Sequence, residues 1–348
     1  MIHEITVEEL LELQRKGEAA FIDVRSPSEF QESTIPDSVN IPIFTDEERA
    51  EIGTLYKQVS VDAAKDRGLE IVSAKLPSFV RSISGTEHRR KVVFCWRGGM
   101  RSRTSATLAS LMGLQMYKLN GGFRAYRKWV VETLESFGEL PPCYVINGYT
   151  GTGKTELLQR LEKLGYPVLN FEEMAQHRGS IFGHIGLAPS NQKSFESALV
   201  HQLLRWKEAP YLIMEAESKR VGKAVLPEFV VRGKEQGKAL FIEMPVAQRV
   251  ANIMADYKPE EHKDDCLNSF KHIEKRIHTP VAAEIRQALE QGRYETAVEL
   301  LLTYYYDSRY QHATDRYEND RVTIQAKDVD DALQQLVKQL PPPPGRYQ

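Results

Sequence analysis

A cysteine stands where a nucleophile is expected, in the stretch VVFCWRGGMRSR at residues 92–103. Cys95 ends a short apolar run typical of a buried strand, and a loop of glycine and arginine leads from it into a helix-forming segment. Backbone N–H groups and a helix N-terminus stabilise negative charge at such a position. We therefore expect Cys95 to be a thiolate and a nucleophile rather than an inert buried thiol.

The loop after this cysteine has the composition of an anion-binding site. Gly98 and Gly99 let the backbone curl so that its amides face one anion. Arg97 and Arg101 add positive charge, and we predict that Arg101 is catalytic together with the cysteine. Trp96 offers either a stacking surface for a base or prenyl chain or an aromatic ring that packs against a helix, and the sequence leaves both alternatives open.

A second glycine-rich loop, GYTGTGKT, follows the apolar stretch CYVI and precedes the helix-forming stretch ELLQRL. It matches the P-loop pattern G-x-x-x-x-G-K-[S/T], in which backbone amides cradle phosphates, the lysine reaches the terminal phosphate and the hydroxyl is available to a metal. We expect a di- or triphosphate here, although ATP hydrolysis does not follow from the loop alone. The predicted phosphate-binding residues are Gly148, Gly151, Gly153, Lys154 and Thr155.

Two later apolar stretches end in acidic residues, in LIMEAES and LFIEMP. Glu215, Glu217 and Glu243 stand where P-loop proteins usually carry a metal-orienting aspartate, unless they pair with local arginines. The sequence predicts neither a dedicated metal site nor a tightly bound cofactor. Mg²⁺ is the candidate ion if one enters with a diphosphate.

The charges of this chain are distributed unevenly. Residues 88–128 hold ten Lys and Arg and no Asp or Glu, so this basic window carries +10 while the whole chain carries −2. We expect a polyanion to bind there. No run of about 18 apolar residues and no signal-peptide pattern is present, so we expect a cytoplasmic protein without a membrane partner. Three widely spaced cysteines suit a reducing compartment.

Apolar runs alternate with helix-forming segments along most of the chain, which predicts parallel sheets of the α/β class. Thr6 and Glu9 have the spacing of a capping box, for a helix that ends at Gly17. A longer helical stretch is predicted over residues 45–83. The alternation begins again after the glycine and prolines of SFGELPP, which predicts two domains.

We place these domains at residues 1–138 and 142–340, the second with a mostly helical part beyond residue 247. The chain ends in PPPPGRYQ, an extended proline-rich stretch. We predict a disordered tail over residues 341–348.

FIDVRSPSEF, IPDSVNIP, the cysteine loop and LNGGFRAYRKW occur in the order found in rhodanese homology domains, and together they resemble that family over nearly all of the first domain. The resemblance implies that Cys95 carries sulfur or selenium as a persulfide-type intermediate. Arg101 follows Cys95 by six positions, whereas common rhodaneses use five. This spacing is similar to that of the cell-cycle phosphatase branch of the fold, and it implies a larger anion such as selenophosphate. Phe94 replaces the histidine that precedes the phosphatase cysteine, which argues against a phosphatase.

The resemblance to a known family extends over the whole chain. Together with the two loops, the following stretches resemble bacterial tRNA 2-selenouridine synthases: HRGSIFGHIG (177–186), QKSFESAL (192–199) and MEAESKRVGKAVLP (214–227). The resemblance implies an enzyme that geranylates the wobble 2-thiouridine of tRNAs for Lys, Glu and Gln from geranyl diphosphate, and then replaces the S-geranyl group with selenium from selenophosphate. It also implies an S-selanylcysteine at Cys95, a partner that supplies selenophosphate, and a second site lined by His177, Arg178 and Glu215.

Two alternatives from other classes fit the same loops. One is an ATP-dependent tRNA sulfurtransferase, in which Cys95 carries sulfur rather than selenium. The other is a non-enzymatic, rhodanese-like binding module that is switched by a nucleotide in the P-loop. Neither explains two anion-binding loops and a basic window as simply.

Overall fold

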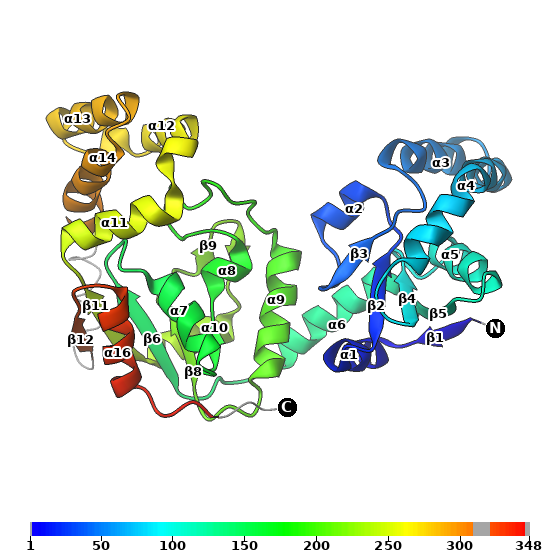
Figure 1. Ribbon diagram of the computed structural model, residues 1–348, viewed down its shortest axis with the longest axis horizontal. Coiled ribbons are helices and arrows are strands. Elements are labelled where there is room, and N and C mark those ends of the chain that lie inside the picture. Colours follow the sequence, from blue (N-terminus) through cyan, green and yellow to red (C-terminus); the bar gives the residue numbers. More distant parts are fainter. Residues whose placement is uncertain (1, 309–320, 345–348) are drawn as a thin grey trace. The chain divides into compact units, whose positions relative to one another are not determined.

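The computed structural model describes residues 2–308 and 321–344 of the chain (Figure 1). The chain divides into two compact units, residues 1–136 and 137–348. Each unit is built on one five-stranded sheet in which every pairing is parallel. The α/β class predicted from the alternation of strands and helices is therefore confirmed.

The first sheet places the strand that leads to the cysteine at its centre. Its strands are β1 (His3–Ile5), β2 (Ala19–Asp23), β3 (Ser38–Asn40), β4 (Arg90–Phe94) and β5 (Gln115–Leu119). Their order across the sheet is β1-β5-β4-β2-β3. The central strands β4 and β2 are almost wholly buried, so they appear in the sequence as continuous apolar runs. The edge strand β1 is too short to show such a pattern, and the sequence did not predict it.

Capping residues set the ends of the first helix. Thr6 Oγ1 accepts a hydrogen bond from the N–H of Glu9, and the carboxylate of Glu9 accepts one from the N–H of Thr6, so the predicted capping box is confirmed. Gly17 ends this helix in the left-handed conformation. The helical stretch predicted over residues 45–83 forms as two helices that pack on each other. Those two are α3 (Asp46–Gln58) and α4 (Val61–Ser84). The other helices of the first unit are α1 (Val7–Lys16), α2 (Pro27–Glu32), α5 (Met100–Leu111) and α6 (Gly122–Ser136).

The second sheet has the P-loop strand at its centre. Its strands are β6 (Cys143–Gly148), β7 (Val168–Leu169), β8 (Leu212–Glu215), β11 (Lys238–Glu243) and β12 (Val322–Gln325), in the order β12-β11-β6-β8-β7. The sequence did not predict β12, which pairs in parallel with β11 from 82 positions further along the chain. It also missed a small antiparallel pair, β9 (Arg220–Val221) and β10 (Ala224–Val225).

Helices cover this sheet and then form a separate group, as predicted for the part beyond residue 247. They are α7 (Lys154–Lys163), α8 (Phe171–Ala175), α9 (Gln192–Arg205), α10 (Glu228–Gln236), α11 (Val246–Tyr257), α12 (Lys263–Lys271), α13 (Thr279–Glu290), α14 (Tyr294–Leu301) and α16 (Val329–Gln339). In Figure 1, α12, α13 and α14 gather at one end of the unit, around an apolar core that includes Phe270 and Ile285. Among the described residues, no helix is both long and apolar enough to cross a membrane.

The first part of the expected disordered tail lies against the second unit. The hydroxyl of Tyr211 contacts the carbonyl oxygens of Pro341 at 3.0 Å and Pro342 at 2.9 Å. Tyr144 packs edge-on against Tyr211 in the same groove. Because Tyr211 fixes two of their carbonyls, the prolines before residue 345 have a defined place. Residues 345–348 lie outside the described residues.

Candidate functional site

The cysteine loop lies between the end of β4 and the start of α5. Cys95 follows β4 directly, so its thiol stands at the carboxyl edge of the parallel sheet and before a helix N-terminus, as the sequence predicts. The first turn of α6 holds the loop from the side. The N–H of Phe123 donates to the carbonyl of Cys95 at 2.9 Å. The N–H of Arg124 donates to the carbonyl of Trp96 at the same distance.

Two glycines allow this turn to approach the loop so closely. Gly98 has a φ of 65°, and a Cβ there would lie 2.7 Å from the carbonyl oxygen of Leu119. A Cβ on Gly122 would lie 2.1 Å from the carbonyl oxygen of Cys95. Within the described part of the chain, the amides of residues 96–99 donate no hydrogen bond. The amide of Gly98 is buried against Gly122, which leaves those of residues 96, 97 and 99 for an external anion.

The thiol of Cys95 is buried, with 3% of the residue exposed. Its Sγ lies 3.2 Å from Oγ of Ser102, which is also buried. A hydroxyl at this distance can donate to a thiolate and stabilise its charge. We did not predict Ser102 from the sequence, although its position directly after Arg101 could have indicated that it lies near the thiol. That Cys95 is a nucleophile stays a prediction.

Arg101 forms an ion pair with Glu29 of α2 instead of pointing freely into the loop. Its Nη1 lies 2.6 Å from Oε2 of Glu29. Burial opposes ionisation of Glu29, but the hydrogen bond and charge of Arg101 hold the pKa of that carboxyl below its usual value. Arg101 can therefore serve an anion in the loop only by sharing its guanidinium or exchanging partners. This ion pair could not be predicted from the sequence, because its partners are 72 positions apart.

The other predicted loop residues differ in exposure. Trp96 is half-buried, with its ring centroid 5.8 Å from that of Phe123, so the packing contact is present while part of the ring stays accessible. Arg97 is exposed. Gly99 is the N-cap of α5, and no atom lies within 4 Å of the position where its side chain would begin.

The basic window does not form one surface. Arg89 precedes β4 and Arg97 follows it, so they lie at opposite ends of the strand. Lys91 is buried, and its Nζ donates to two backbone carbonyls. Besides Arg101, at least three cations of the window form ion pairs: Arg90 with Glu18, Lys118 with Glu4 and Lys128 with Glu132. Beside the cysteine loop, the exposed cations are Arg97, Arg103 and Arg124.

The P-loop connects β6 to α7, which is the strand–loop–helix context that its sequence predicts. Gly148, Gly151 and Gly153 all have positive φ. Two side chains of α11 bind loop carbonyls: Arg249 Nε donates to Thr150 at 2.8 Å and Asn252 Nδ2 donates to Gly151 at 2.9 Å. These contacts hold the carbonyls away from the phosphate cradle.

The lysine and the threonine of the P-loop have partners within the unit. Lys154 Nζ lies 3.2 Å from the carbonyl oxygen of Gly148. The hydroxyl of Thr155 donates to the carboxylate of Glu172. Both groups are thus positioned at the loop by hydrogen bonds.

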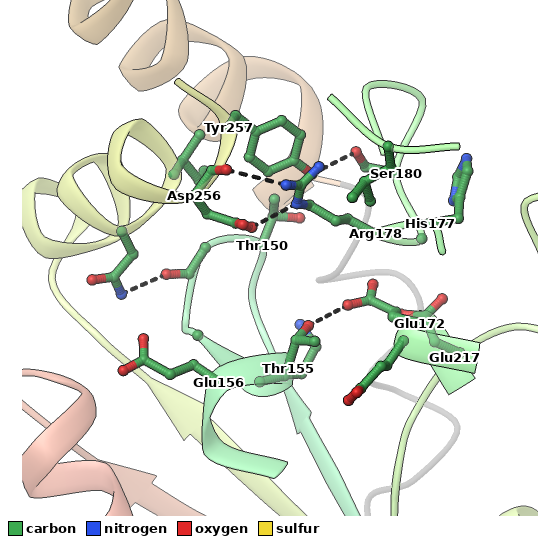
Figure 2. Close-up of a pocket in the computed structure, with 18 of the residues that line it drawn as sticks. Thr150, Thr155, Glu156, Glu172, His177, Arg178, Ser180, Glu217, Asp256 and Tyr257 are labelled. Carbon is green, nitrogen blue, oxygen red and sulfur yellow. Dashed lines mark hydrogen bonds and ion pairs between the residues drawn. The ribbon is translucent and has the colours of Figure 1, made fainter. Parts of the chain in front are cut away.

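A cavity of about 640 Å³ opens beside this loop. The structure brings six predicted residues into this site: Gly151, Gly153, Lys154, Thr155, His177 and Arg178. The predicted residues Gly148 and Glu215 are not among those that line it. Figure 2 shows Thr155 and Glu172 on one side of the cavity and Arg178 on another. The volume lies within the usual range of small-molecule sites, roughly 300–1,000 Å³.

An acidic cluster forms one wall of this site. It comprises Glu172 from α8, Glu215 from the end of β8 and Glu217 just after it, with one carboxylate oxygen from each within 4.8 Å of the others. Burial and the nearby Glu217 carboxylate raise the pKa of Glu172 to about 7. Burial, with Glu172 and Glu217 beside it, also raises the pKa of Glu215 well above its usual value.

Of the three acids predicted near the P-loop, Glu215 and Glu217 belong to this cluster and Glu243 does not. Glu243 does not line the cavity, and its carboxylate accepts a hydrogen bond from Gln325 of β12. Within the described residues, neither Glu215 nor Glu217 pairs with an arginine. We did not predict Glu172 from the sequence. Its position soon after the short apolar run of β7 could have indicated it.

Arg178 holds the far wall of the cavity in place. Its Nε lies 2.8 Å from Oδ2 of Asp256, and its guanidinium stacks on Tyr257 at 4.5 Å from the ring centroid (Figure 2). His177 packs so closely that a Cβ on either Gly183 or Gly222 would lie 2.8 Å from its ring. Burial, with the nearby charge of His184 and Arg178, lowers the pKa of His177.

The two remaining cysteines lack such surroundings. Burial raises the pKa of Cys143 to about 11, and burial together with Asp265 does the same for Cys266. Both are buried thiols. The structure thus places only one of the three cysteines in a loop with open amides.

The fold and these two loops define a chain with a rhodanese-like unit followed by a P-loop unit. The sequence model of the rhodanese-like domain matches residues 6–128, and that of the "tRNA 2-selenouridine synthase AAA domain" matches residues 141–340. The chain belongs to the tRNA 2-selenouridine synthase family.

Curated relatives of that name match most of the chain. The protein of Nitrosomonas europaea is 32% identical over 322 residues, which cover 89% of this chain and 83% of the relative. The protein of Shewanella piezotolerans is 31% identical over 330 residues, which cover 85% and 88%. These similarities span both units.

Proposed function

We propose that this protein is a cytoplasmic tRNA-modifying transferase that converts wobble 2-thiouridine into 2-selenouridine in tRNAs for Lys, Glu and Gln. In the first stage the sulfur of 2-thiouridine attacks the C1 carbon of geranyl diphosphate, and diphosphate leaves. In the second stage the selenium of selenophosphate attacks C2 of the base and the S-geranyl group leaves as geranylthiol. Water then cleaves the P–Se bond, and phosphate leaves. A separate enzyme supplies the selenophosphate.

The observation that carries this proposal is that one chain of this family has both a cysteine loop before a helix N-terminus and a P-loop, two kinds of loop suited to anions. The P-loop beside the 640 Å³ cavity suits a diphosphate with an attached organic group. The loop after Cys95 has open amides next to a thiol, which suits a smaller oxyanion that delivers selenium. Mg²⁺ would screen the charge of the diphosphate at Thr155.

Geranylation and selenation are tested separately by mass spectrometry of nucleosides from a reconstituted reaction. Purified protein is incubated with 2-thiouridine tRNA, geranyl diphosphate and selenophosphate. Cys95→Ala should accumulate S-geranyl-2-thiouridine without 2-selenouridine, because the selenium carrier is lost. Lys154→Ala should leave 2-thiouridine unchanged, because the leaving diphosphate is no longer held.

Two controls separate this proposal from the alternatives. Cys266→Ala removes a buried thiol far along the chain and should retain both products. Thiosulfate replaces selenophosphate in a parallel reaction, and transfer of sulfur from it would indicate a sulfurtransferase. If Lys154→Ala still yields geranylated tRNA while ATP binding is lost, the P-loop holds a nucleotide instead.

A further inference from the structure

Three carboxylates converge beside the P-loop from separate parts of the chain. Glu172 lies in α8, Glu215 ends β8, and Glu217 follows two residues later. One oxygen from each lies within 4.8 Å of the others. Within the described residues none of the three forms an ion pair, and the charge of Lys154 nearby acts on Glu172 and Glu215.

Glu215 provides a second and independent observation. It is fully buried, and its Oε1 accepts a hydrogen bond from the N–H of Glu172 at 2.7 Å. Its Oε2 is buried without any hydrogen-bond partner among the described residues. A buried carboxylate oxygen without a partner is costly, because it has lost its hydration and gained no replacement. The structure therefore leaves one ligand position open in the acidic cluster.

Gly179 leaves space on the open side of the same cluster. A Cβ at this position would lie 2.8 Å from Oε1 of Glu172 and 2.7 Å from Oε2 of Glu217. Any side chain here would press against the carboxylates, so glycine keeps their approach clear. Figure 2 shows the carboxylates of Glu172 and Glu217 facing the same part of the cavity, with Thr155 beside them.

We propose that Glu172, Glu215 and Glu217 form a site for a hard divalent cation, Mg²⁺ or Mn²⁺, which binds before any diphosphate. Carboxylate oxygens are the ligands these ions prefer. Opposite oxygens in an octahedral Mg²⁺ shell lie about 4 Å apart. Neighbouring oxygens lie about 3 Å apart in such a shell. The three carboxylate oxygens, which lie within 4.8 Å of one another, therefore draw closer when they share an ion. Waters and the hydroxyl of Thr155 complete the shell.

The site goes beyond the proposed function, because it needs no substrate to form. A P-loop ordinarily gains its metal together with the phosphates, through one hydroxyl and one distant acid. Here three protein carboxylates give the ion enough anionic ligands to stay without a phosphate. When a diphosphate does enter, the ion already faces it from the Thr155 side of the cavity.

Mn²⁺ binding tests this inference without any activity measurement. Free Mn²⁺ gives a strong electron paramagnetic resonance signal that diminishes on binding, so titration of the full-length protein without diphosphate yields stoichiometry and affinity. We expect one tight Mn²⁺ per chain, displaced by Mg²⁺. Glu217→Gln and Glu215→Gln should each weaken binding by at least about tenfold, since loss of an outer-shell partner alone typically costs about 10–100-fold.

A matched variant controls for general loss of charge in the cavity. Glu156→Gln removes a carboxylate that lines the same cavity but pairs with Arg160, so Mn²⁺ affinity should stay within about twofold of wild type. Circular dichroism checks that each variant folds. If Glu215→Gln does not fold, Glu217→Gln still tests the inference, because Glu217 is only half-buried. No tight Mn²⁺ binding by the wild type, or equal losses in all three variants, would overturn the inference. Geranyl diphosphate binding is measured separately, so a failure of the proposed function is distinguished from a failure of the cation site.

Discussion

The guanidinium of Arg101 lies 2.6 Å from the carboxylate of Glu29, which stands 72 positions earlier in the chain. The pair connects the helix after the cysteine loop with α2, and both side chains are partly buried, 22% and 17% exposed. Glu29 also accepts a hydrogen bond from the N–H of Ser26 at the start of α2. An oxyanion in the cysteine loop must therefore compete with a protein carboxylate for Arg101.

Glu29→Gln should lower the free energy of unfolding at neutral pH and have little effect in acid. The folded-state pKa of Glu29 lies below its unfolded value of about 4.3. Its contribution is therefore complete above the unfolded pKa and disappears as the pH falls through the folded one. Urea unfolding of both proteins between about pH 7 and pH 3 measures the difference. A difference that stays constant over this range would show that the charge of Glu29 does not stabilise the fold.

Ser102→Ala should slow alkylation of Cys95. Its hydroxyl is the polar group 3.2 Å from Sγ, and a hydrogen bond to a charged group contributes about 1.5–3 kcal/mol. We expect the rate with iodoacetamide at neutral pH to fall about tenfold, because the reacting sulfur loses its hydrogen-bond partner. Ser110→Ala is the control, since that hydroxyl donates to Ala106 within the same helix. Equal rates for both variants and wild type would remove Ser102 from the thiol's environment.

Charge reversal of Arg97, Arg103 and Arg124 should weaken tRNA binding more than reversal of Arg89. The first three lie around the cysteine loop, whereas Arg89 stands at the other end of β4. Each lost phosphate contact should reduce the slope of log affinity against log salt by about 1. Filter binding at several salt concentrations measures this slope. If Arg89→Glu has the larger effect, tRNA binds at the opposite edge of the sheet.

Arg249→Ala should destabilise the second unit strongly. Arg249 is 2% exposed, lies 2.6 Å from Asp307 and donates to the P-loop carbonyl of Thr150. Removing one partner of a buried pair costs about 3–5 kcal/mol, because the other charge stays behind. Arg160→Ala, which breaks two more exposed pairs, with Glu156 and Asp330, should cost about 1 kcal/mol. Chemical denaturation of both variants compares them, and similar losses would contradict the role of burial.

The sequence could predict the two loops because each is a local pattern with a required context. A P-loop needs a strand before it and a helix after it, and both apolar patterns lie within a few residues of Lys154. The Cys95 loop could be placed for the same reason. The capping box at Thr6 and Glu9 is likewise decided by residues three positions apart.

What the sequence could not provide are partners that meet only after folding. Glu29 contacts Arg101 and Glu172 contacts Thr155, although these partners lie 72 and 17 positions apart in the sequence. A local sequence pattern does not indicate contacts at such separations. The basic window looked uniform in sequence, but the direction of β4 separates its two ends. Glu243 was placed at the site because it ends a strand, whereas the neighbouring β12 supplies its hydrogen-bond partner.

The position of β12 has a consequence for synthesis on the ribosome. The sheet of the first unit is complete once Leu119 has been made, but β11 gains its outer neighbour only when residues 322–325 emerge. From the synthesis of Glu243 until that of Val322 the nascent chain therefore carries a second sheet with an unpaired edge, which can pair with other chains. Premature termination should thus yield a soluble first unit attached to an aggregating remainder.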